Sequence, residues 1–371
     1  PGAFEPGSLY GKIVLVDRGA CDFSLKISNI AEGGGLIGII GLIAPGDPFE
    51  GGEGTGDSRD QIPGYMVSQT VANRLRSGLP DTVVGFDPAV GKPLAGTIVG
   101  SSARGPQHED TTLIKPEIGA PGASISAIAG TGTDTGPFGG TSGAAPMVSG
   151  AAALVLDASG GVKATPKGTP NGLSVGHGLR PLEVKSLLVN NGYTEVVNDP
   201  LSGALAPITR IGGGEVRVDD AVSAPAAAWA SDVPSGTLSL GFVDVTDTVT
   251  FTKTVTIRNY ENTKRTYDVE PTFRFADDAT NGAVTVSVPE KVDIKPGKGR
   301  DTTFKVTFTI EGSKLRGNFM NSGSQGADPT SLTLNEYDGY LILDDGTHPI
   351  HLPWHVLPRR AAEVVPDTTD L

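Results

Sequence analysis

Ser142 is the residue whose surroundings best suit it to catalysis. It lies in the stretch FGGTSGAAPMVSGAAALVL (138–156). Small residues leave its hydroxyl uncrowded, and the apolar, alanine-rich run behind it predicts a helix. A helix that begins here directs backbone N–H groups and its positive dipole end toward the serine Oγ. Both effects stabilise an oxyanion, so the stretch predicts a serine nucleophile. The alternative is that Ser142 only caps the helix.

A serine nucleophile needs a base, and the candidates within the chain are poor. Asp134, in TDTG, follows GTGT and lies eight residues before Ser142, which indicates a loop. His177, in GHGL, follows the serine in a glycine-rich connection, and His108 lies in a polar loop. Both are expected to be surface histidines. Ala144 stands where the α/β-hydrolase elbow G-x-S-x-G needs its last glycine, which argues against an esterase.

Metal binding is a second kind of chemistry that the sequence invites. His348, His351 and His355 lie close together, but in a pattern typical of a strand. His351 and His355 would then be roughly 13 Å apart, too far to share one ion. The acidic loops 50–60 and 275–282 are candidates for calcium, but they lack the EF-hand spacing and are expected to be solvated. We therefore assign no metal ligand and no required cofactor, and calcium stays unassigned.

The bulk properties bound the class of protein. A chain of 371 residues suggests two or three domains. The net charge of −13 disfavours a nucleic acid partner. Cys21 is the single cysteine, so no intrachain disulfide can form, and we expect it to be packed rather than reactive. No apolar run approaches the roughly 20 residues of a membrane span.

The elements expected to position these residues change in type along the chain. Residues 1–90 predict a small α/β module, with strands over 12–17 and 36–43 and helices over 23–34 and 67–78. Residues 91–222 predict a loop leading into a strand over 115–129, a helix over 146–160 with Pro146 in its first turn, and a helix over 180–192.

From about residue 232, apolar and polar residues alternate with period two and no helix intervenes. The predicted strands lie within 248–260, 283–290, 301–310 and 340–354. This pattern is typical of a β-sandwich. The stretch ASDVPSGT (230–237) is expected to be the linker before it.

Several stretches together resemble the subtilisin-like serine proteases. GTSGAAPMVSGAAAL resembles the family's serine motif, G-T-S-x-A-x-P, and SSARGP (101–106) and KPEIGAPG (115–122) resemble the approach to it. Downstream, RPLEVKSLLVNNG (180–192) and GGGEVRVDDAV (212–222) resemble the closing segments of the catalytic domain. The resemblance implies that Ser142 is the nucleophile, that its backbone N–H belongs to the oxyanion hole, and that Gly140, Thr141, Ala144 and Pro146 support the motif.

The flanking regions carry resemblances of their own. Residues 1–90 look like an N-terminally truncated protease-associated domain, matching its signature at Arg18, Gly19, Cys21, Phe23 and Lys26. Residues 91–229 would be the C-terminal part of an α/β catalytic domain with a parallel sheet. Residues 230–360 resemble a fibronectin-III-like sandwich, and 361–371 a linker. In such subtilases the Asp, the His and the oxyanion Asn precede the inserted domain.

These resemblances imply a secreted or cell-envelope serine endopeptidase that acts on proteins or peptides. We expect both chain ends to be cuts through a longer chain, so that the partner of this piece is the missing N-terminal part of its catalytic domain. Alone, the chain should be inactive. The alternative is a non-catalytic cell-surface adhesion or scaffold protein that retains the fold, although the intact Gly-Thr-Ser argues against it. D-[ST]-G and H-G-T motifs upstream would favour the enzyme.

Overall fold

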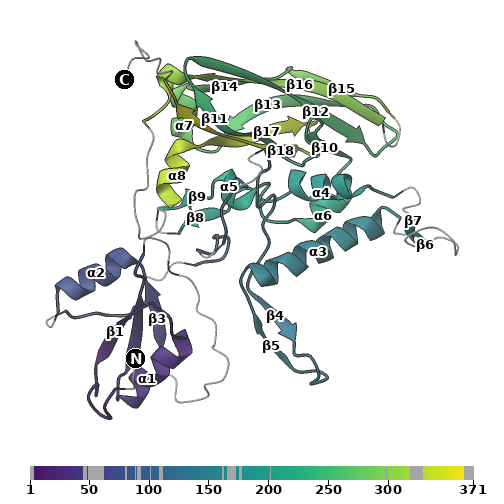
Figure 1. Ribbon diagram of the computed structural model, residues 1–371. Helices are drawn as coiled ribbons and strands as arrows, with labels where there is room; N and C mark the ends of the chain where they lie inside the picture. Colours follow the sequence, from purple (N-terminus) through teal and green to yellow (C-terminus); the bar gives the residue numbers. More distant parts are fainter. Residues whose placement is uncertain are drawn as a thin grey trace, which may run out of the picture. The chain divides into compact units, whose positions relative to one another are not determined.

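The computed structural model describes residues 4–44, 48, 62–79, 82–87, 89, 93–100, 102–107, 112–160, 163–164, 173–174, 178–200, 202–296, 300–317 and 329–362 (Figure 1). The chain divides into two compact units. The first is built mainly from residues before 93, and the second holds most of the residues after it.

The first unit contains a parallel sheet of order β1-β2-β3. Its strands are β1 (Ile13–Asp17), β2 (Ile37–Gly41) and β3 (Gly64–Val67), and its helices are α1 (Phe23–Glu32) and α2 (Gln69–Ser77). Ser68 caps α2 by accepting the Val71 N–H at 3.3 Å. The strands and helices expected over 12–78 are therefore present, and β3 is an addition to them.

Glycines in β2 let both helices approach the sheet closely. A Cβ on Gly38 would lie 2.4 Å from Ile27 of α1, and one on Gly41 would lie 2.6 Å from Ala72 of α2. Residues three apart in a strand face opposite sides of a sheet. The two helices therefore cover opposite faces of the sheet.

The β-rich half of the second unit is a sandwich of two sheets (Figure 1). One sheet has the order β10-β12-β16-β14, with β10 (Ala226–Ala230), β12 (Thr248–Asn259), β16 (Arg300–Glu311) and β14 (Val284–Ser287). The other has the order β11-β18-β17-β13-β15, with β11 (Leu238–Val245), β18 (Ile350–Arg360), β17 (Tyr337–Asp344), β13 (Arg265–Phe273) and β15 (Lys291–Ile294). Short helical segments interrupt these strands in the sequence. Helix α7 (Ala276–Asn281) lies between β13 and β14, and the 3-10 turn η2 (Gly312–Lys314) and helix α8 (Pro329–Asn335) lie between β16 and β17.

The sandwich core explains why the two sheets pack face to face. Trp354 is fully buried between Phe273, whose ring centroid is 5.2 Å away, and Phe308, at 5.6 Å. Its indole Nε1 donates to the Thr272 carbonyl at 3.1 Å, so its polar atom is satisfied as well. The alternating pattern read from the sequence therefore corresponds to inward-facing strand residues.

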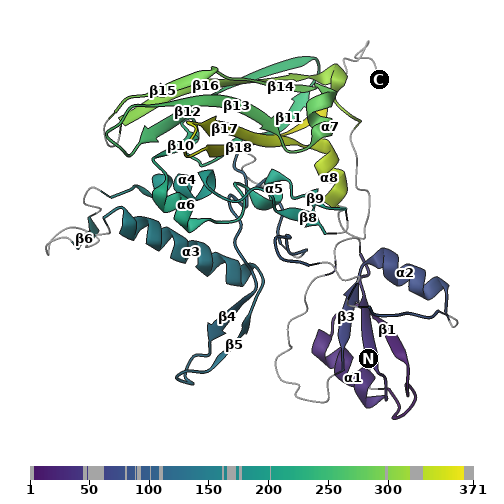
Figure 2. The same cartoon turned by 180° about the vertical axis from the view of Figure 1, so that it is seen from behind.

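The serine-bearing half of the second unit is mainly helical (Figure 2). It comprises the hairpin β4 (Ser124–Ala127) and β5 (Thr135–Phe138), the helices α3 (Thr141–Ala158), α4 (Pro181–Asn190), α5 (Ile208–Ile211) and α6 (Val218–Ser223), and the short pairs β6 (Lys163–Ala164) with β7 (Leu173–Ser174) and β8 (Val197–Asp199) with β9 (Ala204–Leu205).

Strand β10 joins the two halves. Its alternate residues Ala226, Ala228 and Ala230 belong to the sandwich core, whereas Ala227 and Trp229 pack with α3, α4 and α6. The strand thus contributes one face to each half.

Two expectations for this region are wrong. In the described part of 91–229 the strand pairs β4–β5, β6–β7 and β8–β9 are antiparallel, so the predicted parallel sheet is absent there. The stretch 230–237 is not a free linker, because Ala230 belongs to β10 and both Ser235 and Thr237 are buried. Short polar residues at 231–237 indicated solvent, but their hydroxyls are hydrogen-bonded inside the protein.

A buried polar cluster connects α5 with strands β17 and β18. Glu336 is ion-paired with Arg104, accepts the Thr209 hydroxyl at 2.7 Å and lies 3.4 Å from His355 Nε2. Asp338 accepts the backbone N–H of Ile208 at 2.6 Å. Both carboxylates are 1% exposed. Burying a charged carboxylate is costly, and the hydrogen bonds and ion pairs of this cluster offset that cost.

The pKa values of the two carboxyl groups are shifted in opposite directions. Burial raises the pKa of Asp338 to about 7, and the charge of Glu336 adds to the rise. Burial opposes ionisation of Glu336 too, but hydrogen bonding and charge from His355 and Arg104 outweigh it and lower its pKa. Of the two carboxyl groups, Asp338 is therefore the one whose pKa lies near neutral pH.

This cluster predicts a pH-dependent stability. Because the pKa of Asp338 is raised on folding, its contribution is present below about pH 4 and is lost as the pH rises through about 7. The free energy of unfolding should fall by up to about 1.4 kcal/mol per pH unit within that window. Asp338→Asn should flatten the slope, as measured by urea unfolding near pH 5 and pH 8. Asp134→Asn, at an exposed aspartate, is the control, and an unchanged slope in Asp338→Asn would contradict the assignment.

Candidate active site

Ser142 is the second residue of α3, and its side chain is exposed. The N-cap is Gly140, whose φ of 79° is a conformation that favours glycine. The first N–H groups of a helix have no carbonyl one turn earlier to bond. Here the Gly143 N–H donates to the carbonyl of the N-cap Gly140 at 3.0 Å. The predicted serine at a helix start is therefore present.

Close contacts between glycine backbones fix this turn against the preceding hairpin. A Cβ on Gly143 would lie 2.8 Å from the Gly122 carbonyl oxygen, and one on Gly122 would lie 2.9 Å from the Gly140 carbonyl oxygen. The Ser124 hydroxyl donates to the Phe138 carbonyl at 2.8 Å and ties β4 to β5. Gly122, Gly143 and Ser124 are not among the predicted site residues, although Gly122 and Gly143 lie in quoted motifs.

The motif-supporting residues have distinct positions around Ser142. Thr141 is the first residue of α3, and the Ala144 N–H donates to the Gly140 carbonyl at 3.3 Å. Pro146 is not in the first turn as expected, because the helix begins at Thr141 and Pro146 falls in the second turn. A proline there removes the N–H that would bond the Ser142 carbonyl four residues earlier.

The described residues place no base beside Ser142. No hydrogen bond within the described part joins its hydroxyl to a histidine or carboxylate. His351 and His355 are buried in β18, and Asp134 lies in the β4–β5 connection, as expected for a loop. His108 and His177 lie outside the described residues, as does the candidate calcium loop 50–60.

The metal and membrane predictions concern wider features of the chain. Across the described ranges, no group of at least three His, Cys, Asp or Glu side chains is arranged to hold a metal ion. None of the described helices is both long enough and apolar enough to cross a membrane.

Apolar side chains are exposed on the β4–β5 hairpin and on α3. They are Ile125 (76% exposed), Ile128 (48%), Phe138 (41%), Met147 (37%) and Leu154 (56%). Helix α3 packs through Ala151 and Val155 onto α4 and α6. Met147 and Leu154 lie at helical spacing beside these two packed residues.

Comparison with known proteins shows what the serine-bearing region is similar to. Residues 24–206, which include Ser142, match the model of the Subtilase family, Peptidase S8. This match covers just under half of the chain, and the relatives it resembles are proteases.

Three relatives show the extent of the similarity. Minor extracellular protease Vpr of Bacillus subtilis (strain 168) is 27% identical over 335 residues, which cover 84% of this chain and 37% of Vpr. Subtilisin-like protease SBT1.5 of Arabidopsis thaliana is 28% identical, with 58% and 29% covered. SBT1.6 of the same plant is 33% identical, with 42% and 22% covered. The chain therefore spans between 22% and 37% of the length of these three relatives.

The tight glycine contacts predict opposite effects of adding one methyl group within α3. Gly143→Ala should lower the free energy of unfolding by about 1–3 kcal/mol, since its Cβ would overlap the Gly122 carbonyl. Gly150→Ala, where a Cβ meets nothing within 4 Å, should raise it by about 0.5–1 kcal/mol. Urea unfolding of both variants measures the difference. Equal effects would mean that the turn is not tightly packed.

Proposed function

We propose that this chain is the serine-bearing part of a subtilisin-like serine endopeptidase. The observation that carries the proposal is an exposed serine in the first turn of α3, inside a segment that matches the subtilase model. Ser142 Oγ would attack the scissile carbonyl, and the Ser142 backbone N–H would donate to the resulting oxyanion.

The base, the orienting carboxylate and the second oxyanion donor would come from sequence outside these 371 residues. A histidine there would accept the Ser142 proton and return it to the leaving amine. Triad residues act as a unit, so the chain alone should be inactive as a peptidase.

The remaining domains would serve the same enzyme. Residues 1–90 would be a truncated protease-associated domain that influences access or partner binding, and 230–360 a fibronectin-III-like sandwich that braces the catalytic domain. The name of Vpr describes an extracellular protease, which supports an extracellular or cell-envelope location for the parent of this chain. Its substrates would be proteins or peptides, with no cofactor required.

A fluorophosphonate probe tests the nucleophile directly. We expect labelling of Ser142 in a protein extended upstream in its own gene, and none in the chain alone, because only the extended protein would supply the base. Ser142→Ala should abolish labelling. Ser149→Ala, an exposed serine on the same helix, should leave it unchanged. Mass spectrometry of the labelled peptide identifies the site.

Two outcomes would contradict the proposal. Labelling that survives Ser142→Ala would place the nucleophile elsewhere. A folded, extended protein that does not label would favour the adhesion or scaffold alternative.

A further inference from the structure

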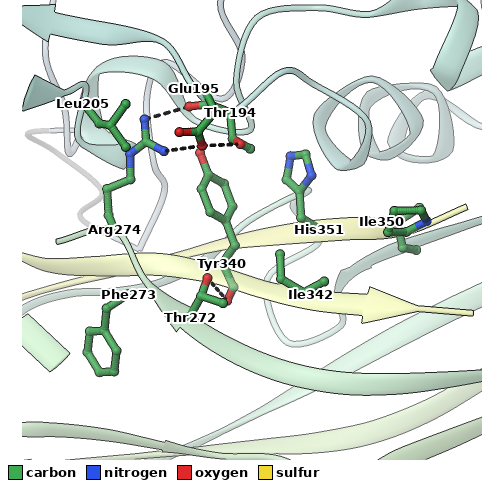
Figure 3. A pocket seen from close by; sticks show the side chains of 11 residues that line it. Thr194, Glu195, Leu205, Thr272, Phe273, Arg274, Tyr340, Ile342, Ile350 and His351 are labelled. Atoms are coloured by element: carbon green, nitrogen blue, oxygen red, sulfur yellow. Dashed lines mark hydrogen bonds and ion pairs between the residues drawn. The ribbon is translucent and has the colours of Figure 1, made fainter. Parts of the chain in front are cut away.

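A cavity of about 440 Å³ lies where the serine-bearing half meets the sandwich within the second unit (Figure 3). Its wall includes Leu205 of β9 and Arg274, just after β13, together with residues of β17 and β18. Ligand cavities commonly have this size and lie at such junctions, with an apolar lining and a few polar groups.

Arg274 is the polar group that defines this cavity. Its side chain is only 3% exposed. Nε donates to the Ala206 carbonyl at 2.8 Å. Nη2 donates to the Thr194 carbonyl at 2.7 Å (Figure 3). These bonds fix the guanidinium in place. The remaining nitrogen, Nη1, lies 3.8 Å from Glu195 Oε1, which is an ion pair too long for a hydrogen bond.

Glu195 is a replaceable partner for this nitrogen. Its side chain is 57% exposed, in contrast to that of Arg274. Its Oε1 accepts the Thr194 hydroxyl at 3.1 Å, an exposed hydrogen bond for which water competes. An exposed carboxylate without a direct hydrogen bond to the guanidinium contributes little and can turn into solvent. The other carboxylate near Arg274, Asp338, is already held by the Ile208 N–H. A ligand carboxylate could therefore take the position of Glu195.

The other polar lining groups are uncharged at neutral pH. Burial lowers the pKa of His351 to about 4, and its Nε2 lies 2.7 Å from the Gly213 carbonyl oxygen. Burial raises the pKa of Tyr340, whose hydroxyl donates to the Gly212 carbonyl at 3.2 Å. Among the described lining residues, Arg274 is thus the cation, and Ile342 and Ile350 add aliphatic surface beside Leu205.

We propose that this cavity binds a carboxylate joined to an aliphatic body. The carboxylate would accept hydrogen bonds from Arg274 Nη1, and the aliphatic part would contact Leu205, Ile342 and Ile350. Two sources share this chemistry: the C-terminus of a peptide that ends in an aliphatic residue, and a free aliphatic acid. Only the peptide source, as a product of peptide hydrolysis, rests on the proposed function.

Isothermal titration calorimetry of the whole chain with N-acetyl-L-leucine tests the site by measuring the affinity for this acid. N-acetyl-L-leucinamide has the same body without the charge and should bind at least about tenfold more weakly. Glu195→Gln should tighten binding of the acid by about two- to fivefold, because it removes the competing carboxylate. Glu290→Gln removes an equal charge at an exposed position away from the cavity and should change nothing.

Further ligands separate the two sources. A short peptide ending in leucine that binds more tightly than 4-methylpentanoate would assign the site to peptide C-termini, and the reverse order would assign it to free acids. The proposal is overturned if no saturable binding occurs, if the amide binds as tightly as the acid, or if Glu195→Gln does not tighten binding. None of these outcomes depends on labelling of Ser142.

Discussion

The two halves of the second unit are held together by buried carboxylates, each of which must be paired to be stable. Glu117, Glu183 and Glu336 are 9%, 3% and 1% exposed. Glu117 and Glu183 each accept hydrogen bonds from both halves of the unit, Glu117 from Lys185 and Ser235 and Glu183 from Arg180 and Arg258. Glu336, beside β17 of the sandwich, accepts the Thr209 hydroxyl of the serine-bearing half and has His355 close by. An unpaired charge in these places would cost several kcal/mol. Separating the halves would leave each carboxylate with part of its partners missing, so they are expected to unfold together.

The serine turn is held by a different kind of contact. Apolar packing anchors α3 through Ala151 and Val155, well past Ser142 along the helix. At its beginning the helix depends on backbone atoms of Gly122 and Gly140 that approach too closely for any side chain. Backbone contacts of this kind leave little freedom for the turn, while the serine hydroxyl itself stays exposed. The backbone at Ser142 is therefore held in place while its hydroxyl remains accessible to solvent.

The sequence predicted elements with strong local patterns and missed features set by tertiary contacts. The helices α1, α2 and α4 and the long strands β12 and β16 have clear periodicity, and they form where expected. The start of α3 was placed too late because Gly140 and Gly143 are poor helix formers, and their close packing is visible only in three dimensions. The polar stretch 231–237 resembles a linker in the sequence because the buried partners of its hydroxyls are also visible only in three dimensions. The cavity at Arg274 could not be predicted, since its walls come from residues far apart in the sequence.

The position of β18 has a consequence for synthesis of the protein. This strand, almost at the end of the described chain, lies inside its sheet between β11, to which it is parallel, and β17. The serine-bearing half also relies on it, because Asn190 donates to the His351 carbonyl at 2.9 Å. A nascent chain that has emerged only as far as residue 349 therefore lacks an interior strand of this sheet and a hydrogen-bond acceptor for α4. Such pairing between distant residues slows folding, so this sheet should remain open until β18 has left the ribosome.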